Sequence, residues 1–261
     1  MDKRIGYFGD ENSYTYACAI EHFRGADMEG FPTIRSAVDA VEKGIVDCAI
    51  VPIENSVGGT VGETLDALKN YEVYITAQYL LPVSHSLIAI AGADKHEIKR
   101  VYSHYQALSQ CEKYLQREFP NAKIISSPST SEALRTIKQR DEVAIARLPL
   151  PGQTVLESGI EDVKTNVTRF VQVEREGKTG ERNASVMFNT LNRPGDLLRV
   201  LEVFKQYELN MKKIESRPAR DGEFSYWFYV ELGDYPSEEV LKAMEESLSS
   251  ITGFIKLLGT Y

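Results

Sequence analysis

Three segments of the chain carry polar side chains in an arrangement that could do chemistry. In the first, Val51–Val61, a predicted buried strand ends where Glu54, Asn55 and Ser56 follow, and two glycines precede a predicted helix. Ligands of open α/β sheets bind at the carboxyl ends of strands, and free N–H groups at a helix start suit an anion. The segment therefore predicts an anion-binding sheet edge, or alternatively a polar turn in which Asn55 or Ser56 satisfies its own backbone.

The second segment, Tyr102–Cys111, follows another predicted strand. Ser103, Gln106 and Gln110 lie at helical spacings and so share a face near the helix start. A capping box between Ser103 and Gln106 would explain both residues without a ligand. Gln110 lies among apolar neighbours and needs a polar partner if it is buried. His104 alone is more often a hydrogen-bonded structural histidine than a catalyst.

The third segment, Asn166–Val173, is β-like. Its Arg169 could grip a carboxylate with two hydrogen bonds, or form a structural ion pair, and spacing does not choose between the two. Together the three segments offer neutral donors, one carboxylate and one arginine, with no nucleophile–base pair, metal-ligand cluster or phosphate loop. They favour binding of an anionic small molecule over acyl or phosphoryl transfer.

The elements that must position these segments alternate short β-rich runs with helical stretches over residues 1–173, which is typical of an α/β fold with largely parallel sheets. That length suits two lobes with a ligand cleft between them. Helices are predicted to begin near Thr33, Thr60, Ser103 and Ser129, the last three with capping boxes. The predicted strands are Ile5–Phe8, Cys48–Val51, Leu87–Ile90, Lys123–Ile125 and Val143–Ala146.

A hydrophilic seam, Glu174–Arg182, contains no apolar side chain and is predicted to be a linker. Beyond it, apolar periodicity predicts the order βαββαβ of a ferredoxin-like sandwich. The predicted helices start near Gly195 and cover Val240–Leu248. The predicted strands are Ser185–Asn189, Met211–Glu215, Ile255–Leu258 and a longer run that turns Phe224, Tyr226, Phe228, Val230 and Leu232 to one side.

Composition excludes several classes of function. The chain has 261 residues, of which 43% are hydrophobic and 26% charged, and a formal net charge of −8. This charge argues against a general nucleic-acid binder. No apolar run approaches the roughly 18–20 residues that span a bilayer, and the first residues do not resemble a signal peptide. Because Cys18, Cys48 and Cys111 fit neither a zinc nor a disulfide pattern, we expect a reduced, cytoplasmic, metal-free protein.

The segments together resemble the prephenate dehydratase family, and the tail resembles its ACT regulatory domain. The order and spacing of the motifs over essentially the whole chain make the resemblance specific. In the tail, Asn192-Arg193-Pro194-Gly195 and Ile214-Glu215-Ser216-Arg217-Pro218 match the family's effector-binding segments. Upstream, the matching motifs are Gly6-Tyr7-Phe8-Gly9 with Ser13-Tyr14-Thr15, Pro52-Ile53-Glu54-Asn55-Ser56, Ser103-His104 with Gln106 and Gln110-Cys111, and Thr168-Arg169-Phe170.

The resemblance implies a two-lobed catalytic region over residues 1–176, like a periplasmic binding protein. Lobe one would take about 1–78 and 163–176 and lobe two about 79–162, with crossings near Ala77–Pro82 and Gly159–Thr165. A linker at 177–182 and an ACT domain at 183–261 would follow. Members of the family act as homodimers or homotetramers, and paired ACT domains bind phenylalanine at their interface.

The implied reaction belongs to phenylalanine biosynthesis and converts prephenate to phenylpyruvate with loss of water and carbon dioxide. Aromatisation drives it, so the resemblance implies no cofactor. Thr168 would protonate or position the leaving hydroxyl, and Glu54 would orient a neighbouring donor. The implied catalytic residues are Thr168, Glu54, Asn55, Ser103 and Gln110, and the implied substrate-binding residues are Ser13, Ser56, His104, Gln106, Arg169 and Phe170. The implied effector site joins Asn192, Pro194, Gly195, Asp196 and Leu197 of one chain to Glu215, Ser216, Arg217 and Pro218 of another.

Several positions depart from the family pattern. Asp10 and Asn12 stand where a proline and a glycine are usual, residues 146–152 replace a stretch of small residues, and Asp196 replaces an alanine beside the effector. Two alternatives therefore stay open. One is an arogenate dehydratase, which shares the framework but prefers the amino form of the substrate. The other is a small-molecule sensor on the same fold that has lost its chemistry.

Overall fold

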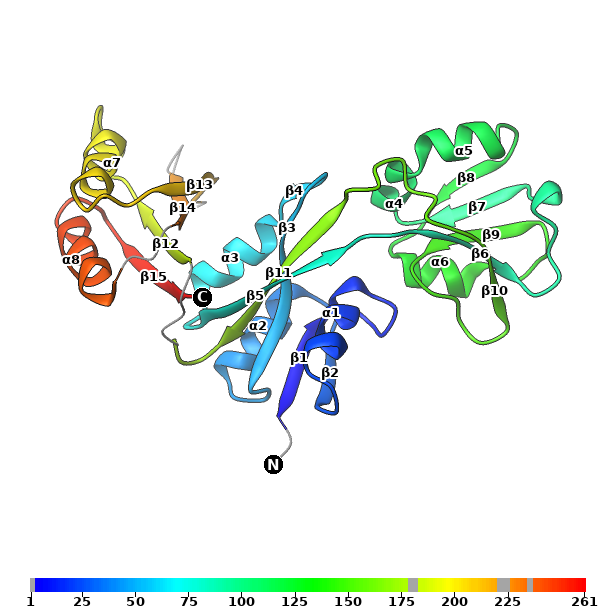
Figure 1. Ribbon diagram of the computed structural model, residues 1–261, viewed down its shortest axis with the longest axis horizontal. Helices are drawn as coiled ribbons and strands as arrows, with labels where there is room; N and C mark the ends of the chain where they lie inside the picture. Colours follow the sequence, from blue (N-terminus) through cyan, green and yellow to red (C-terminus); the bar gives the residue numbers. More distant parts are fainter. Residues whose placement is uncertain (1–2, 178–182, 220–225, 234–236) are drawn as a thin grey trace.

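The computed structural model describes residues 3–177, 183–219, 226–233 and 237–261, and arranges them as three bodies in a row. Figure 1 shows lobe one in the middle, lobe two on the right and the C-terminal domain, residues 183–261, on the left. Within the described ranges, no helix is both long and apolar enough to cross a membrane. Residues 178–182 of the predicted linker lie outside those ranges.

Lobe one is built on a sheet with the strand order β2-β1-β3-β11-β5 and a short β4 on β3. The first three strands are parallel, whereas β11 runs antiparallel to both neighbours. Its elements are β1 (Arg4–Phe8), α1 (Tyr14–His22), β2 (Asp27–Phe31), α2 (Ile34–Glu42), β3 (Cys48–Asn55), β4 (Gly59–Thr60), α3 (Gly62–Asn70), β5 (Tyr74–Pro82) and β11 (Val167–Glu174).

Lobe two has its own sheet, in the order β10-β6-β9-β7-β8, and a separate apolar core. The strands β7, β8 and β9 are parallel, so their carboxyl ends share one edge of the sheet. Its elements are β6 (Ser86–Ile90), the 3-10 helix η1 (Lys95–Glu97), β7 (Arg100–Ser103), α4 (Tyr105–Gln110), α5 (Glu112–Glu118), β8 (Lys123–Ser126), α6 (Thr130–Thr136), β9 (Glu142–Ala146) and β10 (Gln153–Ser158).

Two crossings, residues 83–85 and 159–166, join the lobes side by side. The Val83 N–H donates to the Asn166 carbonyl at 2.9 Å, and the Ile160 N–H donates to the His85 carbonyl at 3.0 Å. The first crossing was predicted near Ala77–Pro82, but β5 continues through these residues because it pairs with β11 as far as Pro82.

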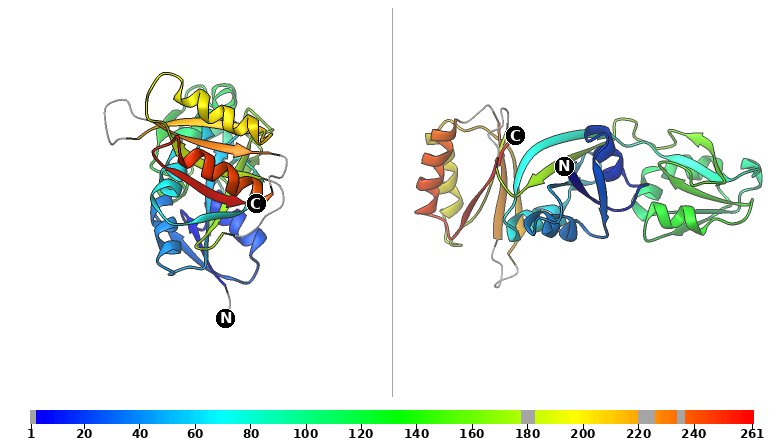
Figure 2. Two further views of the ribbon diagram at one scale, coloured as in Figure 1. Left: turned by 90° about the vertical axis from the view of Figure 1, so that its left-hand side faces the viewer. Right: turned by 90° about the horizontal axis from the view of Figure 1, so that it is seen from below.

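The C-terminal domain has the predicted βαββαβ order, with an antiparallel sheet β13-β14-β12-β15. Phe224 of the predicted long strand lies outside the described residues. Helices α7 and α8 cover the outer face of the sheet, and the other face is turned to lobe one (Figure 2). The elements are β12 (Ala184–Asn189), α7 (Asp196–Gln206), β13 (Met211–Pro218), β14 (Tyr226–Leu232), α8 (Glu238–Ser249) and β15 (Ile255–Thr260).

Both faces of β14 carry buried side chains, which the sequence prediction did not anticipate. Val230 and Leu232 pack with the helices, as expected. Trp227 and Tyr229, on the opposite face of the same strand, join a core shared with lobe one. The domain is therefore docked on lobe one by apolar packing.

Of the three predicted capping boxes, the one at α6 keeps its N-cap: the Ser129 hydroxyl accepts from the Glu132 N–H at 3.0 Å. The other two predictions are wrong, since the N-caps of α3 and α4 are neighbouring residues. The hydroxyl of Thr60 instead donates to Glu215 at 3.1 Å, and that of Ser103 donates to the Ile145 carbonyl at 2.6 Å.

Candidate active site

Asn55 and Thr168, at the lobe-two ends of β3 and β11, form the centre of the site. They are sheet partners, and Asn55 Nδ2 donates to Thr168 Oγ1 at 2.9 Å. The side-chain oxygen Oδ1 of Asn55 accepts from the N–H groups of Val57 at 3.0 Å and Gly58 at 2.8 Å, which fixes the turn. Among the described residues the Thr168 hydroxyl has no acceptor, so its proton is available to a ligand. We call these two residues the cleft pair.

Asn166 belongs to the same cluster although the sequence prediction did not select it. Its Oδ1 accepts from Asn55 at 2.7 Å, and its buried Nδ2 has no hydrogen-bond partner within the described part of the chain. Ser56 ties the turn to β11, accepting from the Val167 N–H at 2.9 Å. The only sequence signal for Asn166 was its place just ahead of Thr168.

Helix α4 of lobe two lies against this turn. A Cβ atom added at Gly58 would come within 2.8 Å of Gln106 Nε2, so Gly58 and Gln106 are in close contact. His104 is half-buried at the N-cap of α4, and burial lowers its pKa, so the imidazole is neutral at pH 7. Ser103 is fully buried, and its hydroxyl donates to the Ile145 carbonyl of the neighbouring strand β9. The structure therefore does not bring Ser103 to the cleft pair.

Gln110 meets a histidine that the prediction missed. His85, which is buried in the first crossing, has its Nε2 2.8 Å from Gln110 Oε1. Burial lowers the pKa of His85 despite the hydrogen bond that its ring makes to Gln110. The Tyr14 hydroxyl donates to the Ser84 carbonyl, and its ring meets the imidazole edge to face. With its proton on Nε2, neutral His85 fixes the Gln110 amide and leaves the amide's NH₂ group for a ligand.

Arg147 follows the end of β9, and His104 follows the end of β7. Because the two strands are parallel, both residues lie at the same edge of the lobe-two sheet. Arg147 is half-buried and makes no hydrogen bond or ion pair with any residue that the structure describes. Burial raises the pKa of the Tyr14 hydroxyl, and the nearby charge of Arg147 opposes this effect. The loop that departs from the family pattern thus supplies an uncommitted cation to this edge.

Arg169 and Glu54 point to the other side of their strands. The Arg169 guanidinium pairs with Glu231 of the C-terminal domain at 2.8 and 2.5 Å and with Glu54 at 2.8 Å. Burial raises the pKa of Glu54, but Lys213 and Arg169 outweigh it and hold that pKa below its usual value. Of the two interpretations of Arg169, the structure shows the ion pair. Phe170 is buried in the core of lobe one, so neither it nor Arg169 joins the cleft pair.

Two residues near the start of the chain are structural. Ser13 caps α1, accepting from the Tyr16 N–H at 3.0 Å. Asp10, a departure from the family pattern, reaches across to α6 of lobe two, where it accepts from Ser131 at 2.6 Å and from Arg135 at 3.1 Å. This contact links lobe one directly to lobe two.

The first predicted effector segment forms the loop before α7. Asn192 and Gly195 adopt the left-handed conformation, with φ of 58° and 88°. Asp196 is 5% exposed, and its carboxylate accepts from the Arg193 N–H at 2.9 Å. Asp196 is therefore turned into its own loop. Pro194 is exposed and Leu197 is half-buried.

The second predicted effector segment, on β13, lies against lobe one. Glu215 accepts from Thr60, and Arg217 forms two hydrogen bonds with Asp66 of α3, at 3.0 and 2.8 Å. The intervening Ser216 and the following Pro218 are exposed. A ligand bound at this segment would therefore touch residues that are directly hydrogen-bonded to α3.

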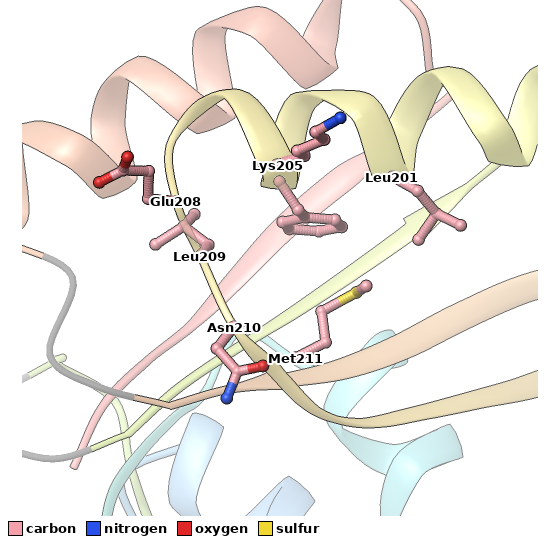
Figure 3. A pocket seen from close by; sticks show the side chains of 7 residues that line it. Leu201, Lys205, Glu208, Leu209, Asn210 and Met211 are labelled. Atoms are coloured by element: carbon pink, nitrogen blue, oxygen red, sulfur yellow. The ribbon is translucent and has the colours of Figure 1, made fainter.

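A shallow hollow lies elsewhere in the C-terminal domain, between the end of α7 and the start of β13 (Figure 3). Leu201, Phe204, Leu209 and Met211 line it. It is at the opposite end of α7 from Asp196, so it coincides with neither the cleft pair nor the predicted effector segments.

Comparison with known proteins identifies the catalytic region. The family model described as prephenate dehydratase matches residues 5–178. The chain belongs to the prephenate dehydratase family. It is therefore a lyase, and the match covers the cleft pair and both lobes.

Similar proteins extend the likeness beyond the region that the prephenate dehydratase model matches. A prephenate dehydratase of Lactococcus lactis is 31% identical, over 99% of this chain and 97% of the relative. The Arabidopsis thaliana protein named arogenate dehydratase/prephenate dehydratase 1, chloroplastic, is also 31% identical, over 99% of this chain and 71% of the relative. The crystal structure of a prephenate dehydratase from Arthrobacter aurescens in complex with L-Phe has a TM-score of 0.88 and 29% identity, covering 98% of this chain and 89% of that one.

Proposed function

We propose that the cleft pair carries the decarboxylative dehydration of prephenate to phenylpyruvate. One observation supports this most strongly: Thr168 Oγ1 accepts from Asn55 while its own proton has no acceptor among the described residues. That proton is placed for the hydroxyl group that leaves the ring. A threonine hydroxyl is a weak acid, so Thr168 acts by hydrogen bonding and positioning as the C–O bond breaks.

The charges around the cleft suit a dianionic substrate. The amides of Asn166 and Gln110 are neutral donors, and Arg147 supplies one positive charge for a carboxylate. The Glu54 carboxylate is occupied by Lys213 and Arg169, so it does not repel the substrate. The ring carboxylate needs no tight cation, since it leaves as neutral carbon dioxide.

The test follows phenylpyruvate formation from prephenate by the full chain. We expect Thr168→Ala to lower kcat by about a hundredfold, a usual contribution of one positioned proton donor. The matched control is Thr165→Ala, which shortens an exposed threonine three residues away and should leave kcat unchanged. Full turnover by Thr168→Ala would remove the assigned role.

Arogenate is the second candidate substrate, because the Arabidopsis relative carries both activities in its name. Rates with prephenate and arogenate, measured side by side on one preparation, decide the preference. A higher kcat/KM with prephenate supports the proposal, and a higher value with arogenate reassigns the substrate without changing the site. Binding of either compound without turnover would favour the sensor.

We further infer that the C-terminal domain is an ACT domain that binds phenylalanine across a homodimer or homotetramer interface and inhibits the enzyme. The support is the βαββαβ topology, the two effector-like segments and a related structure that holds L-Phe. Asp196 does not oppose this, since its carboxylate already accepts a hydrogen bond from its own loop. If Arg217→Ala and Asp196→Ala both leave phenylalanine inhibition unchanged, this placement is wrong.

A further inference from the structure

Four charged side chains meet where the C-terminal domain packs on lobe one, and we call them the inter-domain charge cluster. Arg169 of β11 pairs with Glu231 of β14 through its two terminal nitrogens, Nη1 and Nη2, at 2.8 and 2.5 Å. Arg169 also pairs with Glu54 of β3 at 2.8 Å, and Lys213 of β13 pairs with the second oxygen of Glu54 at 2.5 Å. Each domain thus contributes one cation and one anion.

Three of the four side chains are largely removed from solvent, and Glu54 is 35% exposed. The side chains of Glu231, Arg169 and Lys213 are 9%, 14% and 15% exposed. Removing one partner of such a pair leaves the other charge buried and uncompensated, which is costly. The Tyr229 hydroxyl donates to Glu231 Oε1 at 2.8 Å, so the direction of that carboxylate is set from inside the C-terminal domain.

The cluster and the cleft pair are neighbours on the same two strands. Glu54 and Arg169 are sheet partners, and the next partners along the strands are Asn55 and Thr168. Because successive side chains of a strand point to opposite faces, one pair faces the C-terminal domain and the other is turned away from it. The register shifts between Arg169 and Phe170, and such a bulge re-aims the side chains beside it.

We propose that Glu231 is a positioning residue for the dehydratase reaction and acts across the domain boundary. By holding Arg169 it sets the backbone at the bulge, and hence the direction of the adjacent Thr168 hydroxyl. Glu231 touches no reacting atom, and its effect passes through Arg169. The inference rests on the proposed function of the cleft, and it makes the C-terminal domain a part of the catalytic geometry.

The experiment compares steady-state kinetics of Glu231→Gln and the unaltered full chain on prephenate. A misdirected Thr168 costs most in the transition state, so we expect kcat to fall by about tenfold or more while KM stays within about twofold. Glu231→Asp keeps the charge and should recover part of the loss. A change in KM alone, or no change in kcat, would overturn the proposal.

Lys256→Met is the matched control for domain docking. Lys256 of β15 is another largely buried cation at this interface, where it donates to the carbonyls of Leu68 at 3.0 Å and Tyr71 at 2.5 Å, remote from β11. The Lys256→Met substitution should lower the unfolding temperature without lowering kcat. An equal fall in kcat for Lys256→Met would show that docking alone matters and would also overturn the proposal.

Two further outcomes are informative. If Glu231→Gln does not fold, Glu231→Asp carries the test, because it keeps the charge but shortens the side chain that holds Arg169. A smaller fall in kcat at constant KM supports the proposal, and an unchanged kcat contradicts it. Absence of turnover by the unaltered chain would defeat the proposed function itself and this inference with it, before any variant is compared.

Discussion

Arg147 is the residue that accounts for the substrate's negative charge once Arg169 is committed to Glu231 and Glu54. It stands at the carboxyl edge of the lobe-two sheet, half-buried and without a partner among the described residues. An arginine fork matches a carboxylate with two hydrogen bonds, and such charge-assisted contacts are the stronger kind. We therefore assign it to one carboxylate of the substrate.

Replacing Arg147 should weaken ground-state binding. We expect Arg147→Gln to raise KM for prephenate by about tenfold, since hydrogen bonds to charged groups contribute about 1.5–3 kcal/mol, with a smaller change in kcat. Arg140→Gln is the control, because it removes an exposed arginine from the same lobe. Steady-state kinetics decide the matter, and a KM unchanged by Arg147→Gln would show that the substrate does not use this charge.

At the residue scale the sequence analysis selected Asn55 and Thr168, which are hydrogen-bonded to each other, and Gln110, which is hydrogen-bonded to His85 of the first crossing. The sequence analysis did not show which of Thr168 and Arg169 would face a ligand. Strand alternation shows that the two side chains point in opposite directions, but not which one faces a ligand. That choice depends on the C-terminal domain, which buries one face of β11 and lies far away in the sequence.

Among the elements, β14 shows how the domains are joined. Trp227 is 1% exposed in the core shared with lobe one, whereas the neighbouring Tyr226 is 42% exposed. Lys69 of α3 and Arg217 of β13 also lie over the Trp227 ring, with 5.6 and 5.9 Å from the charged group to the ring centroid. This strand therefore anchors the C-terminal domain to α3.

Truncating this anchor should destabilise the chain markedly. We expect Trp227→Ala to cost about 3–5 kcal/mol of unfolding free energy, the usual cost of deleting a large buried aromatic side chain. Tyr226→Ala, one residue away, should change it by less than about 0.5 kcal/mol. Urea unfolding followed by circular dichroism measures both. Equal effects of the two substitutions would contradict the docking of β14 on lobe one.

Periodicity predicted the strands of this domain and its topology. The apolar residues on the second face of β14, Trp227 and Tyr229, were the available sign that the opposite face is covered too. What covers that face is not encoded locally, since α3 belongs to another part of the chain. The continuation of β5 to Pro82 escaped prediction for the same reason, because it follows from pairing with the distant β11.

Across the whole molecule, the inter-domain charge cluster makes stability depend on pH. The pKa of Glu54 is below its usual 4.5 in the folded chain, despite the opposing effect of burial, because Lys213 and Arg169 favour the carboxylate. A group with a depressed folded pKa stabilises the fold above its unfolded pKa, and this contribution is lost as the pH falls through the folded value. The contribution of Glu54 is therefore complete above about pH 4.5.

Thermal unfolding between pH 7 and pH 3.5 tests this dependence. We expect the unfolding temperature of the unaltered chain to decline more steeply below pH 4.5 than that of Glu54→Gln, which has no carboxylate to titrate at this position. Parallel curves for the two proteins would mean that the carboxylate of Glu54 gains nothing from its two cations.

The three bodies stand in a row, with lobe one between lobe two and the C-terminal domain (Figure 2). The central claim is that the cleft is a prephenate dehydratase site under the influence of that domain. Phenylpyruvate formation from prephenate by the purified full chain, with and without phenylalanine, tests it most directly. The account predicts turnover that phenylalanine suppresses. Absence of turnover on prephenate would contradict it, and turnover indifferent to phenylalanine would contradict the regulatory half.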